Sequence, residues 1–277
     1  MAVRDDLGNR MKEYYENIPK TKLMRRCPVI LRIDGKAFHT FVRGFQKPFD
    51  EVLIKTMQET MKYLCENIQG CVLGYTQSDE ITLVLVDYKK ITSQAWFDYE
   101  VQKLCSIAAS MSTMTFNKFF RDNVDDYLYE NYDEQYLADY IETLQNAVDK
   151  GAMFDCRCFN IPKEEVTNCI YWRQLDASRN SIQMVGQANF SHKELQNKSC
   201  NDIQDMLMVQ KGINWNDLPI YQKRGSCCIR NHMISEPYCN RMLDRNAGEN
   251  EWIIDKDIPI FKGEGRKYID DLVFVGE

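Results

Sequence analysis

Residues 71–87, CVLGYTQSDEITLVLVD, contain two short apolar segments on either side of a polar tip. Each segment has the length and composition of a buried strand, and their close spacing predicts a β-hairpin. The tip has no central glycine, unlike the Asn-Gly or Asp-Gly turns of two-residue hairpins. Instead, Asp79 and Glu80 run directly into the second strand. The hairpin therefore carries two acidic side chains at the end of a buried strand.

The segments that flank this hairpin predict an α+β fold. Strand-like runs and helical spacing alternate around it: strands at residues 29–34 and 152–159, helices at residues 49–67 and 91–120. The resulting order, strand–helix–strand–strand–helix–strand, is the ferredoxin-like βαββαβ arrangement. We therefore expect residues 1–160 to form a ferredoxin-like sheet with helices packed around it.

Residues 161–277 are expected to pack on this sheet, so that the chain forms one compact unit. Helical spacing continues at residues 164–187 and 191–210, and short strands with turns are expected near the C-terminus. At the N-terminus, residues 1–27 predict a helix followed by a basic linker. The acidic, tyrosine-rich residues 121–140 predict a solvated helix or an excursion from the fold.

Composition narrows the class of protein. The chain has 277 residues, of which 44% are hydrophobic, and a formal net charge of −6. Its pI of about 5.3 argues against a protein that coats nucleic acid, although it allows a local basic patch. The N-terminus is charged and has no apolar core of a signal peptide. Without an apolar run of membrane-spanning length, we expect a cytoplasmic protein with no membrane partner.

The 11 cysteines are scattered, and several lie in apolar runs. Reduced thiols packed as small hydrophobic side chains are the favoured interpretation, and Cys156 and Cys158 are expected to share one face of a strand. A zinc site could be drawn from Cys227, Cys228, His232 and Cys239. We do not favour it, because the adjacent pair lacks the usual spacer between zinc ligands.

The acidic tip gains a chemical meaning from the first predicted strand. That strand ends in Asp34-Gly35, and in a split βαβ sheet its end lies beside the hairpin tip. Two carboxylates at one cleft suit hard divalent cations such as Mg²⁺, and Gly35 lets a metal or phosphate approach the backbone. Each acid alone is equally consistent with a turn cap or a solvated side chain. Their pairing favours a metal site for phosphoryl transfer.

Basic residues follow the first acid closely. Lys36, His39, Arg43 and Lys47 all come within twelve residues after Gly35, where exposed amides and cations suit a triphosphate. An ordinary polar role beside Phe38 and Phe41 is the alternative for His39. Lys103 lies among apolar residues of the second predicted helix, where it either reaches a phosphate or extends its stem along apolar surface.

The segments LRIDGKAFHTF and GYTQSDEI resemble the signature pair of the tRNA-His guanylyltransferase superfamily, the 3′-to-5′ polymerases that extend tRNA 5′ ends. The resemblance continues through KPFDEVL, FDCRCFNIPKEEV, YWRQLDASRNS and LPIYQKRG, over most of residues 29–225. The later run NSIQMVGQANFSHKELQNKSCNDIQDML is similar to the bacterial-type, guanylyltransferase-like branch. The resemblance implies a polymerase-palm-like catalytic region over residues 1–160, two Mg²⁺ ions and ATP and GTP as nucleotides. It also implies tRNA as partner and a homotetramer.

Individual roles also follow from this resemblance. It implies that Asp34, Asp79 and Glu80 are catalytic, and that Asp34, Asp79 and the Gly35 carbonyl hold metal. The implied nucleotide-binding residues are Gly35, Lys36, Ala37, Phe38, His39, Lys47, Asp50, Ser78 and Lys103. Basic and aromatic residues near single-stranded ends suit RNA. The RNA-binding candidates are Arg157, Arg173, Arg179, Asn180, Lys223 and Arg224, each equally consistent with a solvated or structural role.

One departure bears on the substrate. Eukaryotic members carry a His-Ile-Asn-Asn-type motif after a Trp-Arg-Gln-x-Asp segment, whereas this chain has Ser178 at the histidine position and keeps Asn180. This resembles the branch that repairs 5′-truncated tRNAs by template-dependent addition. We therefore expect repair through an adenylylated or guanylylated 5′ end. G addition to tRNA-His, a nucleotide- or RNA-binding protein without catalysis, and a nucleotide cyclase on the same palm are the alternatives.

Overall fold

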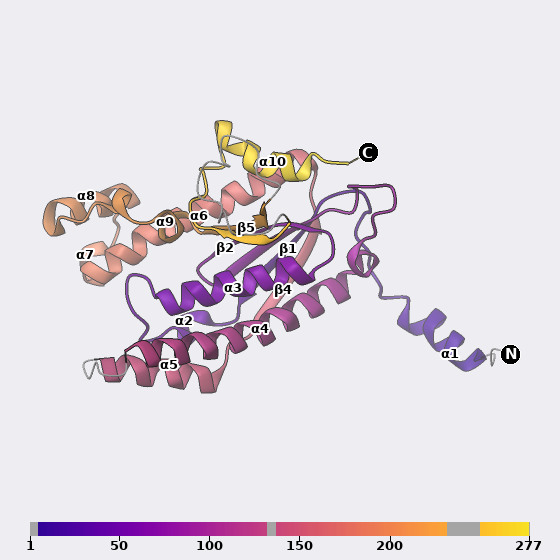
Figure 1. Cartoon of the computed structure of the whole chain (residues 1–277), viewed down its shortest axis with the longest axis horizontal. Coiled ribbons are helices and arrows are strands. Elements are labelled where there is room, and N and C mark those ends of the chain that lie inside the picture. The colour runs from indigo at the N-terminus through magenta and orange to yellow at the C-terminus, as the bar shows by residue number, and fades with distance from the viewer. Residues whose placement is uncertain (1–4, 132–136, 232–249, 277) are drawn as a thin grey trace.

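A computed structural model describes residues 5–131, 137–231 and 250–276. Its centre is an antiparallel sheet with the strand order β4-β1-β3-β2-β5-β6. The strands are β1 (Val29–Gly35), β2 (Cys71–Gln77), β3 (Glu80–Leu85), β4 (Phe154–Asn160), β5 (Ser226–Arg230) and β6 (Trp252–Asp255). Figure 1 shows helices on both sides of this sheet.

The first four strands confirm the ferredoxin-like prediction. Helix α3 (Glu51–Asn67) connects β1 to β2, and helix α4 (Val101–Glu130) connects β3 to β4. This connectivity places β3 between β1 and β2, so the end of β1 and the β2–β3 turn lie at the same edge of the sheet. The β2–β3 hairpin that the sequence predicted is thus the element that brings its acidic tip beside Asp34.

One face of the sheet packs against α3 and α4. Side chains at alternate positions of β1 and β3, including Leu31 and Leu83, are fully buried there. A group of phenylalanines from α4, β4 and the short helix α2 (Phe38–Phe41) fills the end of this core nearest the acids, with Phe38 and Phe116 ring centroids 5.6 Å apart. Because Phe38 is part of this core, the loop that follows Asp34 is anchored by apolar packing.

The opposite face packs against α6 (Lys163–Asn189) and α10 (Lys267–Val273), as Figure 1 shows. Strands β5 and β6 extend the same sheet beyond β2, so the C-terminal residues contribute strands as well as helices. The strand expected in residues 251–274 is present as β6, but residues 267–273 are helical rather than extended. Their buried side chains, Tyr268, Ile269, Leu272 and Val273, have the spacing of one helix face.

Several predicted helices are present with different bounds. The predicted helix at residues 91–120 begins ten residues later, after a short 3-10 helix at Trp96–Tyr99, and extends to Glu130. The predicted helix at residues 191–210 is divided into α7 (His192–Leu195) and α8 (Cys200–Lys211). Serine caps explain the division, because Ser191 and Ser199 each form a capping box that starts a new helix.

The acidic stretch is an ordered part of the fold on both sides of residues 132–136. Its first part is the last third of α4, and its second part begins α5 (Ala138–Lys150), which packs against α4. Among residues 5–27, helical structure is confined to α1 (Asp6–Met11) and a π-helical turn at Lys12–Glu16, although the sequence predicted a longer helix there. In Figure 1, α1 lies away from the body of the molecule.

Short helical segments complete the described chain: a 3-10 turn at Trp215–Asp217, α9 (Ile220–Arg224), and a 3-10 turn at Gly263–Arg266. The segment LPIYQKRG therefore forms α9 followed by a turn at Gly225, where φ is +81°. A Cβ at Gly225 would lie 2.4 Å from the Thr76 carbonyl oxygen. Glycine is thus required where this turn meets the end of β2.

The cysteines that the structure describes are free thiols packed in or beside the cores. Cys227 and Cys228 are buried on opposite faces of β5, one in each core, so these two thiols do not face a common ion. The other candidates for a zinc site, His232 and Cys239, lie outside the described residues. Within the described residues, no group of three or more His, Cys, Asp or Glu side chains has the arrangement of a metal site. Cys156 and Cys158 face α4, where the Cys158 Sγ lies 3.6 Å from that of Cys105.

Candidate functional site

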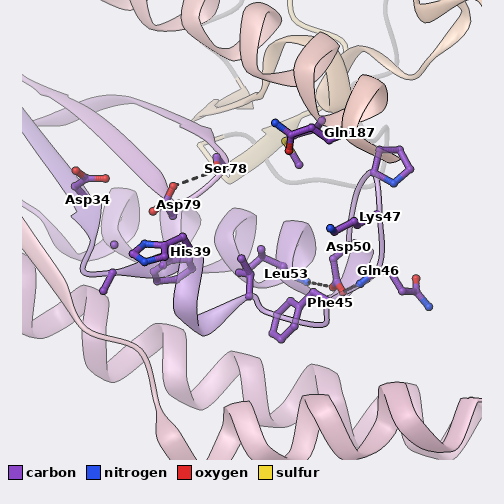
Figure 2. Close-up of a pocket in the computed structure, with 16 residues that line it drawn as sticks. Asp34, His39, Phe45, Gln46, Lys47, Asp50, Leu53, Ser78, Asp79 and Gln187 are labelled. Carbon is purple, nitrogen blue, oxygen red and sulfur yellow. Dashed lines mark hydrogen bonds between the residues drawn. The ribbon is translucent and has the colours of Figure 1, made fainter. Parts of the chain in front are cut away.

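Asp34 and Asp79 lie at neighbouring positions at one edge of the sheet. Asp34 is opposite Glu80 in the β1–β3 pairing, and the Gly35 N–H donates to the Asp79 carbonyl oxygen at 3.1 Å. Both carboxylates line one cavity, as Figure 2 shows. Two strand ends that are adjacent in the sheet thus bring together two acids that are 45 residues apart in the chain.

The surroundings of these acids concentrate negative charge. Burial, followed by the nearby charges of Glu80 and Asp155, raises the pKa of the Asp34 carboxyl above its usual value. Burial is also the main cause of a raised pKa at Asp79. A cation bound between the two carboxylates would offset both effects. The donor set, two carboxylates with the backbone oxygen of Gly35 next to them, consists of the hard oxygen ligands that Mg²⁺ prefers.

The cavity has a volume of about 550 Å³, which is within the range of small-molecule sites. Its wall beside the acids is formed by the loop that follows β1 and by α2. Gly35, Ala37, Phe38 and His39 all line it. The aromatic core beneath Phe38 therefore positions the loop that the sequence predicted to wrap a triphosphate.

Lys47 and Asp50 line the other end of the cavity, at the start of α3. The Asp50 carboxylate caps this helix by accepting a hydrogen bond from the Leu53 N–H at 3.0 Å. Its other oxygen accepts from the Gln46 N–H at 3.0 Å and from the Tyr140 hydroxyl at 2.7 Å. Asp50 is thus held by three donors, one of which comes from α5.

Two residues that line the cavity have left-handed backbone conformations. Ala37 has φ of 52° and Ser78 has φ of 51°. This conformation costs a residue with a side chain about 1–2 kcal/mol. Such strain persists only where the surrounding structure enforces it, and it is concentrated at functional sites. Here it shapes both the loop after Gly35 and the turn that presents Asp79, whose carboxylate accepts from the Ser78 hydroxyl at 3.0 Å.

Glu80 differs from the two aspartates, because its carboxylate already has cationic partners. One oxygen pairs with Arg32, and the other accepts from Arg173 Nε at 3.0 Å and from Gln77 Nε2 at 3.0 Å. Arg173 belongs to α6 and also binds Asp176 at 2.7 Å. Glu80 therefore joins the hairpin to α6 through buried ion pairs.

Sequence reasoning placed Arg173 and Lys223 among candidate RNA contacts, and the structure gives both a different environment. The Arg173 side chain is only 6% exposed and lies in the ion pairs with Glu80 and Asp176. Lys223 is also buried, and its ammonium donates to the Asn216 carbonyl oxygen at 2.5 Å. Neither side chain presents a free cation at the surface, and RNA contact by either residue stays a prediction.

The remaining candidates fall into two groups. Arg157 and Arg179 are exposed, although each has an acidic neighbour, and Arg224 lies at the end of α9. Asn180 lines a smaller hollow beside the main cavity, and Ser78 and Asp50 line the same hollow.

The two predicted nucleotide-binding lysines outside the cavity differ in their surroundings. Lys36 is exposed on the loop after Gly35. Lys103 does not line the cavity and instead contacts Glu100 and Phe97. The structure thus does not bring Lys103 to the acids.

Some residues of the site were not identified from the sequence. Phe45, Gln46, Met184 and Gln187 line the cavity, the last two from the C-terminal part of α6. Phe45 and Gln46 lie between two residues that were identified, Arg43 and Lys47. Nothing in the local sequence of α6 indicates that Met184 and Gln187 face a ligand site, because their position depends on the packing of α6 across the sheet.

Within the described residues, no helix is both long and apolar enough to cross a membrane.

The family model for tRNAHis guanylyltransferase matches residues 8–162, which include β1, the hairpin and β4. An uncharacterized protein of Acanthamoeba polyphaga mimivirus is 30% identical over 239 residues, covering 80% of this chain and 76% of the viral protein. The tRNA(His) guanylyltransferase of Saccharomyces cerevisiae is 27% identical over 222 residues, covering 75% of this chain and 84% of the yeast protein.

Solved structures are similar along almost the whole chain. A bacterial tRNA(His) guanylyltransferase-like protein in complex with ATP is 41% identical, with a TM-score of 0.78, covering 98% of this chain and 100% of that one. A bacterial protein of the same description in complex with GTP is 37% identical, with a TM-score of 0.70 and the same coverage. The similarity therefore includes α6 and the C-terminal strands as well as the residues that the family model matches.

Proposed function

The chain belongs to the tRNA-His guanylyltransferase family, which consists of nucleotidyltransferases, and we propose that it repairs truncated tRNAs by template-dependent 3′-to-5′ addition of nucleotides to their 5′ ends. The observation that supports this proposal most directly is the convergence of Asp34 and Asp79 at a cavity that also contains His39 and Lys47. Carboxylates at one end and a cation at the other suit a metal-bound nucleoside triphosphate.

The proposed reaction has two phosphoryl transfers. An oxygen of the RNA 5′-monophosphate attacks the α-phosphorus of ATP or GTP, and pyrophosphate leaves. The 3′-hydroxyl of an incoming nucleoside triphosphate then attacks the activated 5′-phosphorus, loses its proton, and releases AMP or GMP. The new 5′ end retains the triphosphate. Because such transfers depend on positioning and charge neutralisation, one pair of carboxylates is sufficient for both.

In this proposal Asp34, Asp79 and the Gly35 carbonyl would hold two Mg²⁺ ions, which neutralise charge on the transferring phosphate when bound. The chain's own contribution is positional. The loop from Gly35 to His39 confines the triphosphate, and Lys47 is placed to neutralise it from the far end of the cavity. Glu80 contributes indirectly. Its ion pairs with Arg173 and Arg32 fix the turn that carries Asp79 against α6 and β1.

Repair is proposed over G addition to tRNA-His because of Ser178. Its hydroxyl donates to the Gln174 carbonyl oxygen at 3.1 Å, within the same helix. The histidine position of the eukaryotic motif is thus occupied by a side chain whose hydroxyl is bonded to its own helix. The acidic residues needed for catalysis are all present, which disfavours a binding protein without activity.

The assembly and the compartment are further parts of the proposal. We propose a homotetramer by analogy with the family. We also propose that the protein is cytoplasmic, in agreement with the free thiols of all the described cysteines. Analytical ultracentrifugation at several protein concentrations tests the tetramer. A monomer across the concentrations at which the enzyme is active would contradict it.

A substrate comparison tests the function. Purified protein with Mg²⁺ and ATP is incubated with two 5′-monophosphorylated RNAs: tRNA-His without its extra G, and another tRNA without its first nucleotide. Faster addition to the truncated tRNA, of the nucleotide complementary to the 3′ strand, supports repair. Preference for tRNA-His would instead support G addition. Addition to neither RNA, with Asp79→Asn as the inactive control, would contradict nucleotidyl transfer to tRNA altogether.

A further inference from the structure

The edge strand β4 has a row of side chains on the α6 side of the sheet that α6 does not cover. Alternate residues of β4 point to this side, and Arg157 and Phe159 remain 57% and 37% exposed there. Each residue of this row lies opposite one of β1: Asp155 opposite Asp34, Arg157 opposite Arg32, and Phe159 opposite Ile30. The row therefore runs along the sheet to the carboxylate of Asp34.

Helix α6 adds an exposed aromatic ring to this row. The Trp172 side chain is 53% exposed, and the Arg32 guanidinium lies 5.3 Å from the centre of its ring. Because Arg32 is opposite Arg157, the indole lies on the same side of the sheet as the β4 row. We call Arg32, Arg157, Phe159 and Trp172 the aromatic–arginine track. It combines two exposed rings with guanidinium groups.

Arg157 links the track to the catalytic edge. Its Nη2 atom lies 3.4 Å from Asp34 Oδ2 and 3.5 Å from Asp155 Oδ1. Both distances are long for charge-assisted hydrogen bonds, which are typically 2.7–2.9 Å. This exposed guanidinium is thus available for a phosphate that approaches Asp34. By contrast, Arg32 pairs with Glu80 and is oriented by that contact.

We propose that the aromatic–arginine track binds unpaired nucleotides at the acceptor end of the RNA substrate. Exposed rings give base-stacking surfaces whatever the base, and nearby arginines contact the phosphates. Asp34 borders both the cavity and the track, so an RNA on the track would have its end beside a nucleotide in the cavity. This inference rests on the proposed function and specifies where the second substrate lies.

Direct binding measurements test the track. The probe is a 5′-truncated tRNA with its unpaired 3′ strand, labelled for fluorescence anisotropy, and the matched RNA has the unpaired nucleotides removed. Trp172→Ala is expected to weaken binding of the first RNA about tenfold, as for the loss of one base–aromatic stack. It is expected to have little effect on the second RNA. Trp172→Phe keeps a stacking surface and is expected to retain most of the affinity.

A charge variant gives an independent readout. Arg157→Gln is expected to weaken RNA binding and to reduce the slope of log affinity against log salt by about one, which is the signature of one lost phosphate contact. Phe274→Ala and Arg121→Gln are the controls, because Phe274 is 52% exposed but lies directly after α10, and Arg121 is exposed on α4. Both controls should bind RNA as the unsubstituted protein does.

Each other outcome overturns the proposal in a recognisable way. Unchanged RNA affinity in Trp172→Ala and Arg157→Gln would show that the track does not contact RNA. Equal losses for RNAs with and without unpaired nucleotides would show that Trp172 acts only through the fold. A change in oligomeric state would show that the track contacts a second copy of the chain. If the unsubstituted protein binds ATP but neither binds nor extends RNA, the proposed function itself fails.

Discussion

The buried pairing of Glu80 with Arg173 predicts a large loss of stability in Arg173→Met. The Arg173 side chain is only 6% exposed. Methionine keeps much of its volume but removes the donors to Glu80 and Asp176, so both carboxylates lose a buried partner. Breaking a buried pair on one side costs about 3–5 kcal/mol. Arg32 still pairs with Glu80, and Arg179 still pairs with Asp176, which places the expected cost near the lower end.

We therefore expect the free energy of unfolding to fall by about 3 kcal/mol, and the Tm by about 6 °C at roughly 2 °C per kcal/mol for a chain of this size. Urea unfolding and calorimetry measure the two quantities. Lys55→Met is the matched control, because Lys55 pairs with Asp126 at 3.5 Å with both side chains exposed. Its expected cost is below about 1 kcal/mol.

A double-mutant cycle isolates the interaction. Glu80→Gln combined with Arg173→Met should cost less than the sum of the single substitutions, with a coupling energy of about 2 kcal/mol. If Arg173→Met were as stable as Lys55→Met, the ion pairs would not hold the hairpin to α6. Additive single substitutions would refute the direct coupling between Glu80 and Arg173.

Three further predictions concern the carboxylates, the lysines and the thiols. Burial raises the pKa of Asp79, so ionisation of this carboxyl destabilises the folded state. Asp79→Asn should therefore raise the Tm at neutral pH in the absence of divalent cations. Calorimetry should show that this gain disappears below about pH 4, where the carboxyl is protonated in both the folded and the unfolded state. Lys47→Ala should raise the KM for ATP about tenfold in steady-state assays, whereas Lys103→Ala should change it less than about twofold, since only Lys47 lines the cavity; equal effects would contradict the assignment. Because burial raises the pKa of the Cys65 and Cys227 thiols, mass spectrometry after labelling with a thiol reagent should find both unmodified in the folded protein and modified after unfolding.

The site was predictable from sequence where its parts are local. Asp34 and Gly35 end a strand with a clear apolar pattern, and Asp79 follows a strand that predicts a hairpin. The antiparallel βαββαβ order then places both acids at one edge of the sheet. Local chemistry and topology were sufficient because the acids lie at strand ends.

Features that depend on packing between distant segments were not predictable in this way. Arg173 was expected at an RNA surface, but the path of α6 across the sheet buries it against Glu80. Strand β5 was overlooked because its cysteines alternate between two cores, so the segment has no polar face to reveal a strand period. Lys103 was expected at a phosphate, but the late start of α4 leaves it beside Phe97 and Glu100.

Helix α6 has a mechanical consequence for the two substrates. Trp172 and Gln187 belong to one continuous helix, and their separation of 15 residues corresponds to about 22 Å along its axis. One residue lies on the aromatic–arginine track, and the other lines the cavity proposed to hold the nucleotide. The continuous helix α6 therefore fixes the distance between the two regions. An RNA whose unpaired segment is longer or shorter must change its own conformation to fit, unless the helix itself changes length.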